Sequence, residues 1–235
     1  MSRQMTLSVG LSDHACFDNY FTGDNAEAIQ SIKNLIDERS GQLALFGPAG
    51  SGKTHLLYAA QKMSMAAAQR ATYFSMSDEH MLRRFGGFDD LGELVCVDNI
   101  ELAAGNNPHE RLLFNLIEQT SQAGRALLTT CGRPLAECAF LMADLVSRLQ
   151  RATSYRLHPL TDNQKASAMR LRARQRGFAL PEEVIGYVMN RLPRDTAALF
   201  ALLDRIDRVS LSEQRTVSIP LIKMLEEKKG KLGSE

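Results

Sequence analysis

The stretch "GPAGSGKT", Gly47 to Thr54, carries the strongest structural signal in the chain. It fits the pattern GxxxxGK[ST] at every fixed position, and the apolar run "QLALF" (42–46) leads into it. Glycines let backbone N–H groups converge on phosphate oxygens, and a helix that begins at the lysine adds the positive end of its dipole. The stretch therefore predicts a strand, a phosphate-binding loop and a helix, rather than a simple glycine-rich turn.

The residues of this loop have separable roles in nucleotide binding. Lys53 should reach the outer phosphates, and the hydroxyl of Thr54 should ligate Mg²⁺. The loop residues that we expect to contact nucleotide are Gly47, Pro48, Ala49, Gly50, Ser51, Gly52, Lys53, Thr54 and His55.

A second stretch, "VCVDNIEL" (95–102), ends an apolar run on an acid. Asp98 can reach the Mg²⁺ shell from a strand end, although it could also be a capping acid. Asn99 stands where nucleotide hydrolases usually carry a second acid, and an amide can orient a water molecule but cannot accept its proton. Asn99 could instead cap the turn, and Glu101 lies beyond the strand end. The stretch predicts tight nucleotide binding with slow hydrolysis.

Apolar runs alternate with helical patterns in the first two thirds of the chain, which predicts an α/β domain with a parallel sheet covered on both faces. The expected strands are 42–46, 71–75, 94–97, 125–130 and 154–157. A helix should cover Lys53 to Ala67, and another should follow Asn107 as its N-cap, with Pro108 at its first position.

Beyond Pro159 the patterns are helical, over 161–176, 182–191, 196–210 and about 219–228, and "TDNQ" (161–164) is a capping box. "RTVSI" (215–219) could add a short strand, and the polar tail should fray. We expect a tail at 1–14, an α/β domain at 15–160 and a small helical domain at 161–235.

Composition excludes several classes of protein. The chain has 235 residues, 44% hydrophobic and 23% charged, as in an ordinary soluble protein, and its net charge of +1 gives no general basic surface for nucleic acid. The longest apolar run, "AALFALL" (197–203), is too short to span a bilayer, and the first residues lack a signal peptide, so we expect a cytoplasmic protein. The four cysteines form no CxxC pair or zinc site and are interpreted as structural.

The order of these motifs resembles the AAA+ ATPase family, and within it the DnaA-like branch with its shorter members, the Hda group. The resemblance covers about residues 15 to 225. Four further segments carry it: "CFDNYFTGDNAEAI" (16–29), "LLTTCGRP" (127–134), "DLVSRLQRA" (144–152) and "RLPRDTAALFALLDRI" (191–206). It implies an AAA+ P-loop domain with a five-stranded parallel sheet, followed by an all-helical lid.

The resemblance also implies residues around the nucleotide. Phe17, Asn19 and Tyr20 would lie near the base, although simple packing would equally explain these aromatics. Thr130 would act in the sensor 1 strand, because Cys131 stands where a polar or acidic group is common.

Ala197 stands at the sensor 2 arginine position, and Arg194 just before that helix is the candidate to replace it. Together with Asn99, these departures affect sensing or hydrolysis of a γ-phosphate and leave the grip on a diphosphate intact. The expected cofactors are ADP (or ATP) and Mg²⁺.

Arg148 lies in the segment that resembles the arginine-finger region of AAA+ proteins. Such a finger enters the nucleotide site of a neighbouring molecule, where its planar charged fork stabilises the transferred phosphoryl group. Spacing alone would favour a surface salt bridge or a helix-end cap; the resemblance favours the finger.

The segment "QMTLSV", Gln4 to Val9, resembles the peptide that docks on the bacterial β sliding clamp. Leu7 and Val9 would enter a hydrophobic cleft while Gln4 makes polar contacts. The alternatives are a disordered start and an edge strand.

The resemblance implies a negative regulator of replication initiation that binds the DNA polymerase III β sliding clamp and, with ADP in its own site, promotes hydrolysis of DnaA-bound ATP through Arg148. Its own ATPase activity should be weak or absent, and DNA contact should be mainly indirect, through the clamp. The chain should lack the DNA-reading helix-turn-helix domain of the initiator. The alternatives are a DnaC-like helicase-loading or remodelling ATPase and a stand-alone nucleotide-binding module; homo-oligomer formation stays open.

Overall fold

The structure is a computed structural model that describes residues 15–79, 91–192, 195–213 and 216–232. The chain divides into two compact units, Met1–Pro159 and Leu160–Glu235. The first contains the sheet, and the described part of the second is helical. Of the helices in the described ranges, none is both long and apolar enough to span a bilayer.

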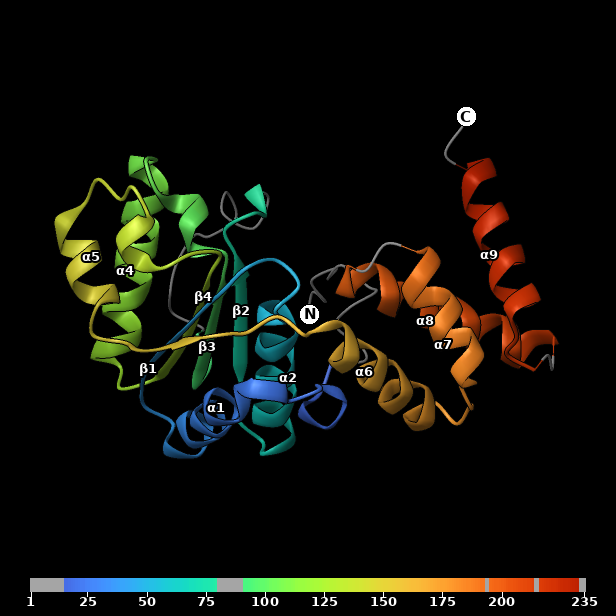
Figure 1. Cartoon of the computed structure of the whole chain (residues 1–235). Helices are drawn as coiled ribbons and strands as arrows, with labels where there is room; N and C mark the ends of the chain where they lie inside the picture. Colours follow the sequence, from blue (N-terminus) through green and yellow to red (C-terminus); the bar gives the residue numbers. More distant parts are fainter. Residues whose placement is uncertain (1–14, 80–90, 193–194, 214–215, 233–235) are drawn as a thin grey trace, which may run out of the picture. The chain divides into compact units, whose positions relative to one another are not determined.

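A parallel five-stranded sheet, in the order β2-β3-β4-β1-β5, forms the centre of the first unit (Figure 1). The strands are β1 Gly41–Phe46, β2 Ala71–Ser75, β3 Leu94–Asp98, β4 Ala126–Cys131 and β5 Thr153–Arg156. Every strand begins and ends within one residue of its predicted position, and all pairings are parallel. The predicted α/β fold is confirmed. Because β3, β4 and β1 are neighbours, their carboxyl ends share one edge of the sheet.

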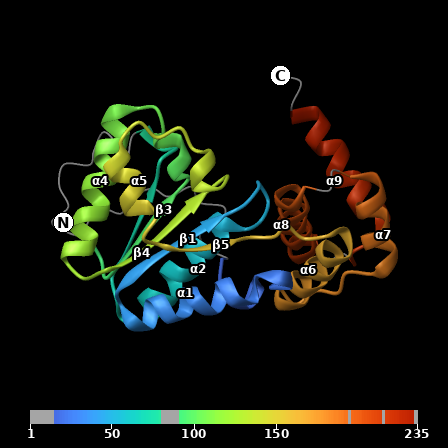
Figure 2. The same cartoon turned by 60° about the vertical axis from the view of Figure 1, so that its left-hand side comes forward.

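Helices cover both faces of this sheet (Figures 1 and 2). They are α1 Ala26–Glu38 and α2 Lys53–Ala66 on one face, and α4 Asn107–Gln122 and α5 Ala143–Leu149 on the other. The alternation of side chains along β3 shows this division: Leu94 and Cys96 join the core under α1 and α2, whereas Val95 and Val97 join the core under α4 and α5. A strand buried on both faces reads as a continuous apolar run, which is the pattern of β3 up to Asp98 at its end.

The second unit is built from α6 Asp162–Gln175, α7 Glu182–Arg191, α8 Thr196–Glu213 and α9 Ile219–Leu232. All four helices contribute to one apolar core, with Met169, Val188, Leu203 and Ile222 fully buried. Thr161 and Gln164 form the predicted capping box at the start of α6, where the hydroxyl of Thr161 accepts from the Gln164 N–H at 3.3 Å.

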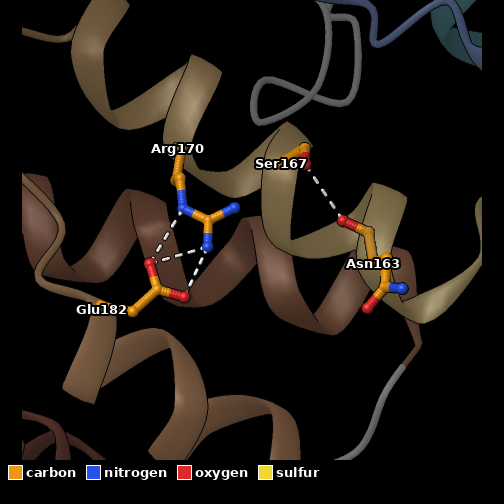
Figure 3. A network of polar contacts seen from close by, with 4 residues as sticks. All are labelled: Asn163, Ser167, Arg170 and Glu182. Carbon is orange, nitrogen blue, oxygen red and sulfur yellow. Dashed lines mark hydrogen bonds and ion pairs between the residues drawn. The ribbon is translucent and has the colours of Figure 1, made fainter.

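A forked ion pair joins α6 to the first turn of α7 (Figure 3). The Arg170 guanidinium donates to both carboxylate oxygens of Glu182, with Nη2 at 2.6 Å and 2.7 Å. On α6 itself, the hydroxyl of Ser167 donates to the backbone carbonyl of Asn163 at 3.1 Å. Since the Glu182 side chain is 77% exposed, this pair stabilises the unit by about 1 kcal/mol at most.

Two local expectations were wrong, and one open alternative, a short strand near residue 217, does not form in the described residues. The N-cap of α4 is Asn106, whose side chain accepts from His109 N, because Asn107 is already helical. Helix α9 extends to Leu232, beyond the predicted end at about 228. Lysine and leucine, three of the four added residues, favour the helix, and Gly230 between them does not prevent it. Thr216–Ser218 form no strand and Ile219 begins α9, while Arg215 lies outside the described residues.

Candidate nucleotide-binding site

The phosphate loop joins β1 to α2 and has the backbone that its glycines permit. Gly50 and Gly52 have φ values of 78° and 91°, in the left-handed region that other residues avoid. Gly47 needs its small size for another reason: a Cβ there would lie 2.6 Å from the carbonyl oxygen of Leu157. Pro48 and Ala49 are exposed at the tip of the loop.

Ser51 gives the loop an unused polar atom. Its hydroxyl oxygen is buried and has no hydrogen-bond partner among the described residues. A buried hydroxyl without a partner is costly, and a phosphate oxygen in the loop would satisfy it. This atom, together with the glycine backbone, fits a bound phosphate.

Lys53 is the first residue of α2 and is only 9% exposed. Its ammonium group donates to the carbonyl oxygens of Gly47 at 2.7 Å and Pro48 at 3.0 Å. Burial lowers the pKa of the Lys53 ammonium, and the nearby carboxylates of Glu101 and then Asp98 oppose that shift. The Lys53 ammonium is therefore buried beside the phosphate loop, where it could contact the phosphates of a bound nucleotide.

Asp98 is the centre of a polar cluster at the end of β3 and is 1% exposed. One carboxylate oxygen accepts from the Thr54 hydroxyl at 2.7 Å and from Tyr73 OH at 3.0 Å, and the other accepts from the Thr130 hydroxyl. Hydroxyl and carboxylate oxygens are ligands that Mg²⁺ prefers, so Thr54 and Asp98 fit the predicted metal position. The structure brings Lys53, Thr54, Asp98 and Thr130 together.

Tyr73 belongs to this cluster and was not predicted from the sequence. It lies on β2, beside β3, and its ring stacks on Tyr58 of α2 with centroids 4.8 Å apart. Burial, and then the charge of Asp98, raise the pKa of the Tyr73 phenol. The phenol is therefore a permanent donor to Asp98.

Asn99 has a left-handed backbone, with φ 58° and ψ 48°, directly before a short 3-10 helix, η3 Ile100–Ala103. Asparagine adopts this conformation at small cost, which explains the residue type in backbone terms. Its N–H donates to the Thr130 hydroxyl at 3.0 Å, but its side chain makes no capping bond. Asn99 thus lies at the N-cap position of η3, as the capping alternative has it, and its carbonyl oxygen accepts from Leu102 N at 3.0 Å.

The entry segment packs against the loop. Tyr20 OH donates to the Ser51 carbonyl at 3.0 Å, and the Tyr20 ring lies so close to Gly52 that a Cβ there would be 2.5 Å from it. Burial raises the pKa of the Tyr20 phenol to about 12, with a smaller opposing effect of the Asn25 hydrogen bond. The Asn25 amide also pairs with both backbone groups of His158, at 3.1 Å and 2.8 Å. Tyr20 thus packs against the phosphate loop at Ser51 and Gly52 and stabilises it.

The other entry residues also make contacts with the protein itself. His55 Nε2 lies 3.0 Å from the Cys16 carbonyl oxygen, and the Asn19 side chain accepts from Cys16 N at 3.1 Å. Phe17 lies under the ammonium of Lys33, which is 5.4 Å from the ring centroid. These contacts agree with the alternative that the entry residues simply pack against the protein. Their contact with the nucleotide base remains a prediction.

Some predicted residues lie outside the described residues: Arg194, Gln4, Leu7 and Val9. Ala197 is described and is exposed in the first turn of α8. All four cysteines are free. Cys131 ends β4 and is buried, with its sulfur 3.5 Å from that of Cys138.

Arg148 lies near the end of α5, on the face of the sheet opposite α2. Its side chain is 31% exposed, and its Nε lies 2.8 Å from Oε1 of Glu118 on α4. Glu110, fully buried on α4, accepts N–H bonds from Leu141 and Met142 and so fixes the start of α5. Arg148 is thus a partly exposed cation on a firmly positioned helix.

Comparisons with known proteins agree with this architecture. Residues 162–225 match the protein family described as "Hda, lid domain". Domain III of the replication initiation protein DnaA from Thermotoga maritima superposes with a TM-score of 0.75 at 19% identity, over 93% of this chain and 98% of that one.

Two more solved structures share the fold. DnaA from Aquifex aeolicus, bound to AMPPCP, has a TM-score of 0.72 at 18% identity over 94% of this chain and 70% of that one. A Thermotoga maritima RuvB mutant has a TM-score of 0.58 at 16% identity over 91% and 71%. Residues 162–225 thus match the lid-domain family, and the chain shares the fold of these solved structures.

Proposed function

We propose that this chain is a DnaA-related negative regulator of replication initiation, which holds ADP in its own site and promotes ATP hydrolysis in a neighbouring DnaA molecule. The observation that carries the proposal is the separation of two basic groups. Lys53 is buried in an internal phosphate loop, and Arg148 is partly exposed on the opposite face of the sheet.

Nucleotide binding follows from the internal cluster. The backbone of Gly47–Thr54 and the Lys53 ammonium would hold the phosphates, and the unsatisfied Ser51 hydroxyl would donate to one of them. Thr54 and Asp98 would hold Mg²⁺, which when bound neutralises phosphate charge. The AMPPCP-bound DnaA relative supports a nucleotide in this fold. Because Asn99 carries no acid, we expect slow hydrolysis in this site, while the grip on a bound diphosphate stays intact.

Action on the partner requires Arg148 to exchange its present ion pair. The pair with Glu118 is partly exposed, and such pairs contribute about 1 kcal/mol or less, so a phosphoryl group can replace the carboxylate at small cost. The guanidinium is planar and always charged, which suits it to the charge that spreads over a transferred phosphoryl group. In this proposal DnaA supplies that group and the attacking water.

In this proposal, the N-terminal tail brings the chain to the sliding clamp, where it would act on DnaA. Gln4, Leu7 and Val9 form the clamp-binding peptide of the proposal, and they precede the described residues. An extended peptide can dock in a hydrophobic cleft without the folded unit changing shape. Tethering to a DNA-loaded clamp would raise the effective concentration of the chain near newly replicated DNA. DNA contact would then be indirect.

A reconstitution tests the proposal. The full chain with ADP, DNA-loaded clamp and DnaA carrying γ-labelled ATP are mixed, and release of label is followed with each component omitted in turn. We expect rapid release only in the complete mixture. Release that is equally fast without the chain would refute the regulatory function. Replacement of Gln4 and Leu7 by alanine should abolish both clamp binding and stimulation while ADP affinity stays the same; retained clamp binding would refute the tail assignment alone.

A further inference from the structure

Glu101 has an environment that its place in the sequence does not suggest. It follows β3 in the short helix η3, and its Oε2 atom is buried with no hydrogen-bond partner among the described residues. A buried carboxylate oxygen without a partner costs free energy and asks for an explanation.

The backbone around this carboxylate is shaped to admit it. Oε1 of Glu101 lies where a Cβ of Gly132 would be only 2.6 Å away, so glycine at 132 leaves the space that the carboxylate occupies. Gly132 directly follows β4, whose last residue, Cys131, pairs with Phe46 and accepts the Gly47 N–H at 3.2 Å. Glu101 therefore reaches from the exit of β3 to the exit of β4, beside the first residue of the phosphate loop.

Electrostatic effects also indicate that the Glu101 carboxylate lies near the phosphate loop. The charge of Glu101 opposes the effect of burial on the pKa of Lys53 more strongly than Asp98 does. Lys53 holds the carbonyl oxygens of the loop, so the carboxylate lies near the cation that would contact the outer phosphates. Asn99, two residues earlier, turns through a left-handed backbone, which re-aims the chain after the strand.

We propose that Glu101 supplies the acid that is missing at Asn99 and acts as the catalytic base for slow hydrolysis of ATP in the chain's own site, so that the protein makes its own ADP form. This inference rests on the nucleotide-binding part of the proposed function and not on the action of Arg148.

The reaction is an ordinary phosphoryl transfer to water. A water oxygen held by the Glu101 carboxylate attacks the γ-phosphorus, and a new P–O bond forms. The bond from that phosphorus to the β–γ bridging oxygen breaks, and ADP leaves with the electron pair. The proton of the water passes to the carboxylate and then to solvent. No other reactant is required.

The test uses the full chain without DnaA or clamp. The protein is loaded with γ-labelled ATP and Mg²⁺, and single-turnover release of phosphate is measured. Glu101→Gln should slow release by at least about 100-fold, the low end for loss of a general base, while ADP affinity and thermal midpoint stay unchanged. Glu137→Gln, an exposed acid in the segment after β4, is the matched control and should hydrolyse at the wild-type rate.

Nucleotide content gives a readout apart from rate. Wild-type protein purified from cells should contain ADP, and the Glu101→Gln variant should contain ATP. Adding Asn99→Asp to Glu101→Gln should restore hydrolysis, because aspartate tolerates the left-handed backbone and returns the carboxylate. A structural or merely electrostatic role for Glu101 would not be rescued in this way.

A second variant covers the case in which Glu101→Gln does not fold. Gly132→Ala keeps every charge but pushes the carboxylate away by the volume of a methyl group, and it should also slow phosphate release. Wild-type hydrolysis by both variants, or intact ATP in the wild-type protein after prolonged incubation, would overturn the proposal. Equal losses of rate and ADP affinity would overturn it too, since Glu101 would then be only a charge partner of Lys53. All of these measurements follow the nucleotide bound to this chain, without DnaA or clamp. Their failure can therefore be distinguished from a failure of the DnaA assay.

Discussion

Lys53 and Arg148, the two basic residues of the proposed mechanism, occupy opposite environments. Lys53 is 9% exposed, begins a helix and is held by two carbonyl oxygens of its own loop. Arg148 is 31% exposed, lies at the end of a short helix and is held by one carboxylate. The first environment suits a permanent ligand within the chain, and the second suits a group that changes partners. In the proposed function, this difference lets one unit hold one nucleotide and act on another.

The largest effect on the internal side is expected from Lys53→Ala. Loss of a charged donor to phosphate should weaken ADP binding by about 100-fold, since hydrogen bonds to charged groups contribute about 1.5–3 kcal/mol each. Titration with a fluorescent ADP analogue measures the change. Lys62→Ala, an exposed lysine on the same helix, is the control and should bind ADP normally. Equal affinities in the two variants would contradict the assigned role of Lys53.

A smaller effect is expected from Gly52→Ala. A side chain at φ 91° is strained, and its Cβ would also meet the Tyr20 ring at 2.5 Å, so the loop must shift and ADP affinity should fall about tenfold. Gly105→Ala separates the two causes, because φ there is 79° with nothing within 4 Å of the added Cβ. Its unfolding free energy should fall by about 1–2 kcal/mol from backbone strain alone, without a change in ADP affinity. Normal ADP binding by Gly52→Ala would contradict this prediction, because neither the backbone strain nor the contact with Tyr20 would then disturb the loop.

The smallest effect is expected from Glu118→Gln, on the outward side. The variant releases Arg148 from an ion pair of at most about 1 kcal/mol, so stimulation of DnaA should rise by no more than about fivefold. Adding Arg148→Ala should cancel the gain completely. An increase that persists in the double variant would mean that Glu118 does not act through Arg148.

The sequence predicts the fold well where the signal is local. The five strands, the capping box at Thr161 and the loop at Gly47–Thr54 each depend on neighbouring residues, so pattern alone locates them. Tyr73 and Asn25 were missed because their partners, Asp98 and His158, meet them only after the sheet has formed.

The sequence placed Glu101 beyond the strand end and gave it no role in the site. The left-handed turn at Asn99 and the absence of a side chain at Gly132 bring it back toward the loop, and neither effect can be read from spacing. The ends of helices were also uncertain, as α9 shows, because polar residues with high helix propensity give no apolar stripe.

The central claim is that hydrolysis occurs in a partner's site and depends on Arg148. Its most direct test is single-turnover release of phosphate from DnaA-bound, γ-labelled ATP, with the clamp present and this chain loaded with unlabelled ADP. Arg148→Ala should lower the stimulated rate by about 10³-fold or more, as loss of an arginine finger does, while exposed Arg151→Ala, in the same segment, stays at the wild-type rate. Full stimulation by Arg148→Ala, with ADP and clamp binding intact, would contradict the account.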